Sequence, residues 1–174
     1  TIKTAKFSYR EDKIMNKEKV ILFDGTSLDG WTSRWSKGTP NWTIEDGCMT
    51  VGNEDIISDY KFGDAHIHVE FKTPDMPDKW GQEKGNSGVY VHGCYEVQVL
   101  DSYHVTEPLN NDCSGIYSIY APLCNACKPA ERAEHAFQMR LFSHFPSEIL
   151  QAHIASFQTA HLRFAFGVIV YSTN

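Results

Sequence analysis

The sequence predicts a single all-β domain, built as a sandwich or a barrel of short strands. Between residues 20 and 101, short apolar stretches alternate with clusters of Gly, Pro, Asp and Asn, which is typical of strands joined by turns. No stretch shows a helical period long enough for crossover helices between parallel strands. A length of 174 residues suits one domain with a substantial core. Short strands at this spacing favour a sandwich or a barrel.

Six segments have the composition of strands, and two have that of loops. The dipeptide Asp46-Gly47 is a strong hairpin turn between two of the strands. The segments 73–87 and 102–114 are rich in Pro, Gly, Asn and charge, so we expect surface loops that can line a site, the first of which exposes Trp80. The predicted strands are 20–23, 42–45, 48–51, 66–72, 89–92 and 96–100.

Composition excludes several classes of function. With 41% hydrophobic residues the chain is expected to be ordered, and a formal net charge of −6 argues against nucleic acid as a partner. No stretch approaches the roughly 20 apolar residues of a membrane span, and residues 1–19 are too charged for a signal peptide. We expect an exported protein whose signal precedes this numbering, with a cytoplasmic location as the alternative.

Five cysteines leave their chemistry open. Cys124 and Cys127 have the C-x-x-C spacing of zinc sites, but a structural zinc site needs a second ligand pair, and only Cys113 and His104 are near in sequence. A disulfide such as Cys113 with Cys127 and unreactive thiols are the alternatives. We expect no cofactor, and a divalent cation stays an open alternative.

Alternation places polar side chains together on one sheet face. In segment 66–72 the apolar residues point to one side, and His66, His68, Glu70 and Lys72 point to the other. The hairpin of 89–92 and 96–100 is predicted to have the three-residue loop 93–95, which places all its valines on the core side. Its register then pairs Val89 with Val99, Val91 with Val97, Tyr90 with Gln98, and His92 with Glu96.

The predicted polar patch therefore holds Tyr90, His92, Glu96 and Gln98, joined by His68 and Glu70 from another strand. Sugar sites need such carboxylates, amides and aromatic rings. A solvated outer sheet face is the alternative. Asp101 would point into the core by strict alternation, so we expect the strand to end at Leu100 or a bulge to turn Asp101 toward the polar face.

Several ordered motifs together resemble one known family. They are LFDGTSLDGW (22–31), WTIEDG (42–47), KFGD (61–64), NSGVY (86–90) and YEVQVLDS (95–102). Over residues 20–131 the chain is similar to the 3-keto-disaccharide hydrolases, formerly a domain of unknown function. The resemblance implies a concanavalin A-like, laminarinase-type jelly-roll sandwich of two antiparallel sheets.

The resemblance also implies a reaction on a carbohydrate oxidised to a ketone at C3. The ketone acidifies the hydrogen on C2, so that a base can remove it, the C1 leaving group departs and water adds. Glu96 is then the candidate base or acid, with His92 as its proton partner and Asp101 to orient a partner or bind a cation. Tyr90, Gln98 and Asn86 would hold hydroxyl groups or the keto oxygen, and Lys128 would stabilise an enolate.

The chain departs from the family after Glu131. We divide it into an N-terminal extension (1–19), a sandwich domain (20–131) and a divergent segment (132–174) that could complete the sandwich. In the last segment, Ser147 could cap a helix whose apolar stripe ends at Phe157, and 164–171 is predicted to be a strand. If the segment supplied no strands, the sandwich would be incomplete and activity in doubt.

Two other functions remain consistent with the sequence. One is a non-catalytic carbohydrate-binding sandwich that uses the polar face and Trp80. The other is a glycosidase with two carboxylates, Glu96 with Glu70 or Asp101, for which the carboxyl groups would lie about 5–10 Å apart.

Overall fold

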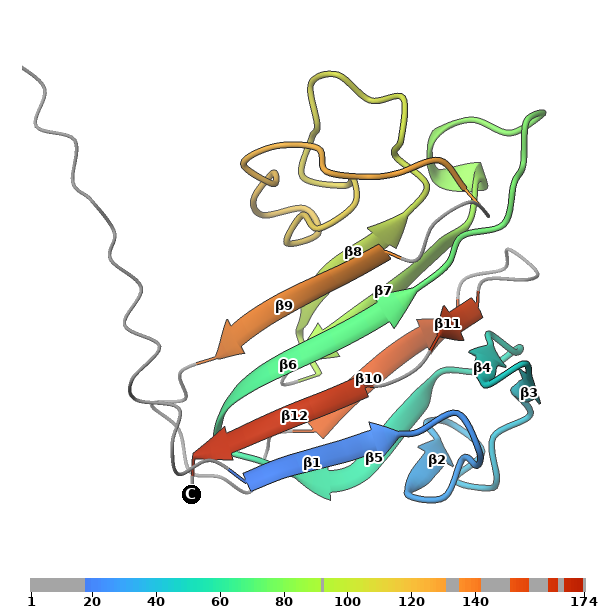
Figure 1. The fold of residues 1–174 in the computed structure, drawn as a ribbon, viewed down its shortest axis with the longest axis vertical. Coiled ribbons are helices and arrows are strands. Elements are labelled where there is room, and N and C mark those ends of the chain that lie inside the picture. Colours follow the sequence, from blue (N-terminus) through green and yellow to red (C-terminus); the bar gives the residue numbers. More distant parts are fainter. Residues whose placement is uncertain are drawn as a thin grey trace, which may run out of the picture.

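The computed structural model describes residues 18–91, 93–130, 135–141, 151–156, 163–165 and 168–173. This part of the chain is strand-rich, and its strands pair antiparallel in two main sheets and one small sheet (Figure 1). None of the helical structure in these residues has the length and apolar character needed to cross a bilayer. The predicted all-β sandwich is therefore confirmed.

The first main sheet has four strands and pairs the two ends of the chain. The N-terminal strand and the last strand are hydrogen-bonded neighbours, with a register shift between Ile21 and Phe23. The C-terminal strands thus belong to the folded sheet. The spatial order is β1 (Glu18–Phe23), β12 (Val168–Thr173), β6 (Asp64–Phe71) and β9 (His135–Leu141).

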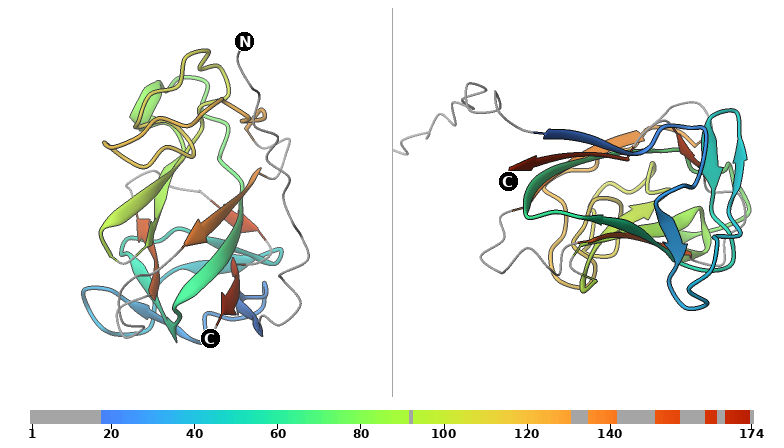
Figure 2. Two further views of the ribbon diagram at one scale, coloured as in Figure 1. Left: turned by 90° about the vertical axis from the view of Figure 1, so that its left-hand side faces the viewer. Right: turned by 90° about the horizontal axis from the view of Figure 1, so that it is seen from below.

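The second main sheet has five strands and packs against the first, as the view from below shows (Figure 2). A small third sheet closes one end of the sandwich. The order in the second sheet is β2 (Trp31–Ser33), β5 (Ile56–Lys61), β10 (Gln151–Ser156), β7 (Asn86–Val91) and β8 (Tyr95–Leu100). The order in the third is β11 (Arg163–Ala165), β4 (Cys48–Thr50) and β3 (Thr43–Glu45).

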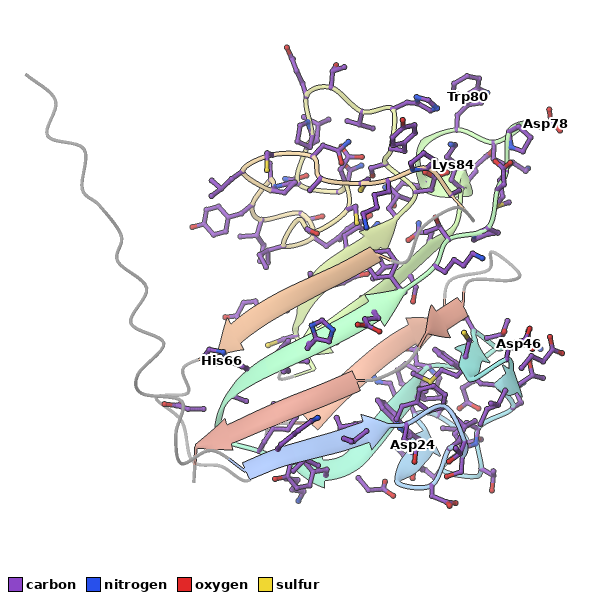
Figure 3. All side chains as sticks on the ribbon, viewed as in Figure 1. Asp24, Asp46, His66, Asp78, Trp80 and Lys84 are labelled. Atoms are coloured by element: carbon purple, nitrogen blue, oxygen red, sulfur yellow. The ribbon has the colours of Figure 1, made fainter. Side chains whose placement is uncertain are left out.

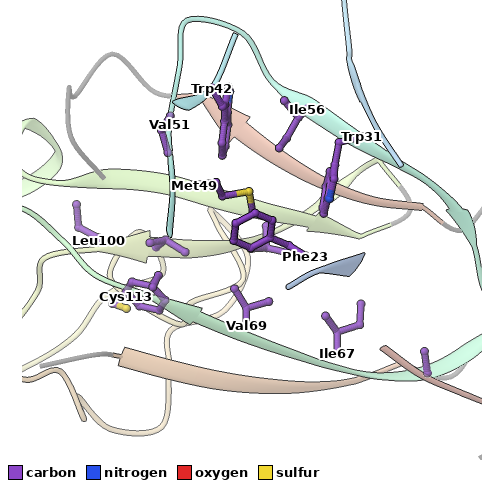
Figure 4. Packing of buried hydrophobic residues seen from close by; sticks show 14 of the residues in the cluster. Phe23, Trp31, Trp42, Met49, Val51, Ile56, Ile67, Val69, Leu100 and Cys113 are labelled. Carbon is purple, nitrogen blue, oxygen red and sulfur yellow. The ribbon is translucent and has the colours of Figure 1, made fainter. Parts of the chain in front are cut away.

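The core fills the space between the two main sheets (Figure 4). β6 alternates strictly, so that its apolar residues are buried and its polar residues are not. Two buried tryptophans keep their ring N–H groups satisfied, because Trp31 donates to the Leu22 carbonyl and Trp42 to the Glu54 carbonyl, each at 2.7 Å. The core includes Phe23, Trp31, Trp42, Met49, Ile56, Phe62, Ile67, Val69, Phe71, Val89 and Val99.

Turn chemistry agrees with the sequence at one hairpin. Asp46 and Gly47 both take positive φ, 53° and 72°, between Glu45 and its partner Cys48. Two such residues make the turn whose twist suits a two-residue hairpin loop. The predicted hairpin turn is confirmed.

Two predictions about the C-terminal segment are wrong. Residues Gln151–Ser156 form a strand between β5 and β7, where hydrogen bonds on both edges override the helical stripe seen in the sequence. The single strand expected over 164–171 is two strands, β11 and β12, in different sheets. Ser147 and Phe157 lie outside the described residues.

Three strands were not anticipated from the sequence: β9 in the four-stranded sheet, and β2 and β5. β2 is only three residues long, and β5 carries Ser58, Asp59 and Lys61 among its apolar residues. Both belong to the five-stranded sheet that carries the predicted site. Because β2 and β5 were not predicted, the polar residues at their ends were not assigned to the site.

Candidate functional site

The hairpin β7–β8 has the predicted faces in a different register. Val89 pairs with Val97 and Tyr90 with Glu96, so the predicted register is wrong by two residues. The loop is residues 92–94, and Gly93 in its middle has a φ of 66°, a conformation that glycine adopts easily. Because a shift of two residues keeps every side chain on its own face, the polar grouping survives. His92 lies outside the described residues.

Glu96 forms a direct hydrogen bond with its cross-strand partner. The Tyr90 hydroxyl donates to Glu96 Oε2 at 2.7 Å. Burial raises the pKa of the Glu96 carboxyl, this hydrogen bond lowers it, and the nearby charge of Asp55 raises it; the net shift is upward. Burial also raises the pKa of Tyr90, as do its hydrogen bond to Glu96 and the charge of that carboxylate. Tyr90 therefore stays protonated and acts as the donor.

The Glu96 side chain lies over Gly88 on the neighbouring strand. A Cβ built on Gly88 would lie 2.6 Å from Glu96 Cγ and would overlap the carboxylate. Real Cβ atoms do not tolerate such a distance. Because Gly88 has no side chain, the Glu96 carboxylate can lie over this position of the sheet.

Gln98 lies between Glu96 and the amide side chains of Gln82 and Asn86. Its Nε2 donates to Gln82 Oε1 at 3.0 Å and to Asn86 Oδ1 at 3.3 Å. With the amide turned over, its nitrogen instead donates to Glu96 Oε1 at 3.3 Å and to the Ser87 carbonyl at 3.0 Å. Gln98 can therefore serve the carboxylate or the amide group of Gln82 and Asn86.

The face is more buried than a solvated sheet surface would be. The exposed fraction is 6% for Glu96, 1% for Gln98 and 6% for Asn86. Polar groups this buried require partners, and the hydrogen bonds above supply them. The alternative of an ordinary solvated face does not describe these three residues.

Two residues that the sequence analysis missed belong to the same face. Arg34 follows β2 and Asp55 precedes β5; they form an ion pair at 3.5 Å, and their charges act on Tyr90. Their neighbours Ser33 and Ile56 are buried and lie in the row that continues through Ile154, Val89 and Val97. Alternation therefore puts Arg34 and Asp55 on the face of Tyr90 and Glu96. Recognition of β2 and β5 as strands could have revealed them.

Two tryptophans in the segments that carry Arg34 and Gln82 are exposed. Trp80 is 80% exposed, as expected, in the loop before the 3-10 helix Gly81–Glu83 (Figure 3). Trp35 is 67% exposed, and its ring lies 4.6 Å from the Arg34 guanidinium carbon. Exposed indole rings with a polar neighbourhood are suited to stacking on sugar faces.

Glu70 and His68 do not lie with Glu96. Both are on β6, in the four-stranded sheet, and alternate with buried Ile67, Val69 and Phe71. They therefore face outward on the opposite side of the sandwich, where His68 Nε2 lies 3.0 Å from Glu70 Oε1. The structure separates this pair from the β7–β8 face.

Asp101 and Lys128 lie in the loops that follow β8 and Cys127. The strand ends at Leu100, and Asp101, 7% exposed, forms an ion pair with Lys84 at 2.9 Å. Its Oδ1 also accepts a hydrogen bond from the Tyr103 N–H at 3.4 Å, as a strand-end residue that caps a turn does. Lys128 is exposed in the loop after Cys127. Within the described residues, no three His, Cys, Asp or Glu side chains form a metal-binding group.

This geometry defines a class of protein. An antiparallel sandwich that presents a buried carboxylate, a phenol and amides on one sheet face, beside exposed indole rings, has the features of glycoside hydrolase-like sandwiches. Fold alone would not assign the chemistry. Comparisons with known proteins supply the family.

The chain belongs to the family of the 3-keto-alpha-glucoside-1,2-lyase-like domain, whose model matches residues 18–137. A candidate glycosyl hydrolase from Parabacteroides distasonis ATCC 8503 has a similar solved structure, 25% identical, with a TM-score of 0.70 over 87% of this chain and 82% of that one. These similarities support a glycoside hydrolase-like function. No curated protein gives a match.

Two further solved structures of candidate glycosyl hydrolases come from the same bacterium. They have TM-scores of 0.64 and 0.65, cover 90% of this chain, and cover 94% and 100% of their own chains. Both are 15% identical to this chain. At that identity the likeness shows the fold alone.

Proposed function

We propose that the protein cleaves a glycoside whose sugar carries a ketone at C3, and that Glu96 is the general base. The observation that carries the proposal is the Glu96 carboxyl itself, buried, with a raised pKa, and hydrogen-bonded to Tyr90. A base with a pKa nearer neutrality than that of an exposed glutamate is better matched to taking a carbon-bound proton. The name of the matched family supports the substrate class.

The reaction runs in two stages that balance overall. Glu96 takes the proton from C2, the electrons move to the C3 oxygen as an enolate, and the bond from C1 to the leaving oxygen breaks. Water then adds at C1, and the proton on Glu96 returns to C2. The leaving group departs as an alcohol with the proton that the added water releases, so the sum is hydrolysis.

Positive charge and hydrogen-bond donors on this face would stabilise the enolate. Arg34 is the cation whose charge reaches Tyr90, and we assign the enolate oxygen to it in preference to Lys128, which is exposed on a separate loop. Gln98 and Asn86 supply amide donors for sugar hydroxyls, and Trp80 or Trp35 a stacking surface. Preorganised donors of this kind stabilise developing charge most when water is excluded.

Replacement of Glu96 by Gln tests the proposal. We expect the release of the leaving group from a 3-keto glucoside to fall by about 10²–10⁴-fold, the usual contribution of a general base. Glu70→Gln should keep full turnover, because Glu70 lies on the other side of the sandwich. Unchanged turnover in Glu96→Gln would remove Glu96 from the mechanism.

The pH profile gives a second readout of the same residue. The base must be ionised, so kcat/KM should fall as the pH drops through the pKa of Glu96. Because burial raises that pKa above the ordinary glutamate value, the acid limb should lie at higher pH than about 4.3. The limb should be absent from any residual activity of Glu96→Gln.

Isotope exchange separates this mechanism from the two alternatives. In D₂O, wild-type protein should exchange the C2 hydrogen of the keto substrate, as NMR can follow, and leave the parent glycoside intact. Cleavage of the parent glycoside without exchange would indicate a two-carboxylate glycosidase. Binding of either sugar without turnover would indicate a carbohydrate-binding sandwich.

A further inference from the structure

Two cysteines that the proposed reaction does not use meet beside the core. Cys113 is 6% exposed and belongs to the core cluster (Figure 4). Cys127 packs against the same cluster. Their thiols lie close enough that each shifts the pKa of the other. In the structure both are free thiols. Two neighbouring thiols at the edge of one core cluster are placed to form a disulfide.

Ser102 and Asn125 together hold the backbone at both cysteines. Ser102 Oγ accepts the N–H of Cys113 at 3.1 Å, and the Ser102 carbonyl accepts a hydrogen bond from Asn125 Nδ2 at 2.6 Å. Asn125 Oδ1 in turn accepts the N–H of Cys127 at 2.9 Å. This network holds the backbone at both cysteines in place. The proximity of the two thiols is therefore fixed by hydrogen bonds and does not depend on the positions of two unconnected loops.

The contact also activates one of the thiols. The hydrogen bond from Cys127 lowers the pKa of Cys113 to about 7, and the same interaction raises the pKa of Cys127. A thiol with a pKa near 7 is substantially ionised at neutral pH, and the thiolate is the form that attacks a disulfide.

We propose that Cys113 and Cys127 form a redox modification site, in which a small-molecule disulfide such as oxidised glutathione converts the two thiols into an intramolecular disulfide. Cys127, the more exposed of the two, attacks the external disulfide as its proton passes to the Cys113 thiolate, and Cys113 then gives this proton to the first thiol as it departs. The Cys113 thiolate attacks the Cys127 sulfur of the mixed disulfide and releases the second thiol, which takes a proton from water. The protein loses two electrons and two protons, and the external disulfide gains both.

The new bond would fasten a segment that borders the proposed catalytic strand. Residues between the two cysteines flank β8, where Ser114 N donates to the Gln98 carbonyl at 2.8 Å and Tyr117 N to the Glu96 carbonyl at 2.9 Å. Closure of a loop of about 15 residues stabilises the fold mainly by restricting the unfolded chain. Oxidation should therefore raise Tm by roughly 6–12 °C.

Thiol counting and peptide mapping test the proposal without any substrate. After incubation of the full chain with oxidised glutathione, the number of free thiols should fall from the five in the sequence to three. A non-reduced digest should contain peptides joined through Cys113 and Cys127. Five remaining thiols, glutathione adducts alone, or a bond between Cys124 and Cys127 would each overturn the proposal.

Serine variants provide the matched controls. Cys127→Ser and Cys113→Ser should each abolish the crosslink and the rise in Tm; Cys127 is the safer of the two because it is only partly buried. Cys94→Ser and Cys124→Ser remove exposed thiols and should keep both effects. None of these measurements requires turnover of a substrate. A negative result would therefore leave the proposed reaction unaffected, and failure of the proposed reaction would leave the disulfide proposal unaffected.

Discussion

The position of the Glu96 side chain depends on Gly88. Its side chain crosses from β8 over β7, where Gly88 leaves the space that the carboxylate fills. Gly88 pairs with Gln98, one row further along the hairpin. A glycine in a strand often marks a close approach of another group, and here that group is the proposed base.

Gly88→Ala should therefore displace Glu96 without unfolding the protein. The added Cβ would overlap the carboxylate, so the side chain must leave its hydrogen bond to Tyr90, and we expect turnover of the keto substrate to fall at least 10-fold. Gly38→Ala is the matched control, since its nearest heavy atom would be 3.8 Å away. Equal turnover in the two variants would contradict the position assigned to Glu96.

Alternation along one hairpin correctly grouped part of the site. Tyr90, Glu96 and Gln98 share a face because side chains on a strand alternate with a period of two, and Asn86 extends the group. Arg34 and Asp55 could not be grouped in this way. They flank β2 and β5, which connect to β7 and β8 through β10. The local sequence pattern does not show this pairing of strands.

At the scale of elements, the loop of the β7–β8 hairpin shows how a turn selects a register. The sequence suggested Gly93 as the first loop residue, whereas in the structure it is the middle one, with positive φ. Moving the loop by one residue moves the pairing by two. The faces were therefore predictable from valine positions, and the partner of Glu96 was not.

Lys84 and Asp101 join the two loops that follow β6 and β8. Asp101 N donates to the Gly85 carbonyl at 3.0 Å, and the side chains form an ion pair at 2.9 Å with exposed side-chain fractions of 17% and 4%. A bulge toward the polar face is not needed to explain Asp101. An aspartate in this position is satisfied by the lysine of the neighbouring loop.

Lys84→Met should destabilise the fold because it leaves the Asp101 carboxylate with poorer compensation. We expect the free energy of unfolding in urea to fall by roughly 1–3 kcal/mol. Lys79→Met is the comparison, since the pair of Lys79 with Glu83 is 3.8 Å apart and exposed, and its loss should cost less than about 0.5 kcal/mol. Similar values for both variants would assign no stabilising role to the Lys84 pair.

At the scale of the whole molecule, the C-terminal strands complete both main sheets. β10 lies inside the five-stranded sheet, and β12 lies between β1 and β6 in the other. The segment with the least family-like sequence thus supplies two interior strands and the edge strand β9. Interior strands carry backbone hydrogen bonds on both sides, so the sandwich depends on them.

Truncation after Ala130 should prevent cooperative folding. Loss of β9, β10, β11 and β12 would split the five-stranded sheet and leave β1 without its partner, which exposes core residues to water. Thermal unfolding followed by near-UV circular dichroism should show no cooperative transition. Removal of residues 1–17, which precede β1, should preserve it. A truncated chain that melts cooperatively would contradict this dependence.

The sequence by itself determined the fold class, the position of one tight turn and the polar face of one hairpin. Each of these follows from local periodicity and turn chemistry, which act between residues close along the chain. Tertiary structure alone decided the strand identity of Gln151–Ser156, the position of Arg34 and Asp55 beside Tyr90, and the placement of Glu70 on the far side. These depend on hydrogen bonds between strands far apart in sequence, whose energy is gained only when the sheets assemble.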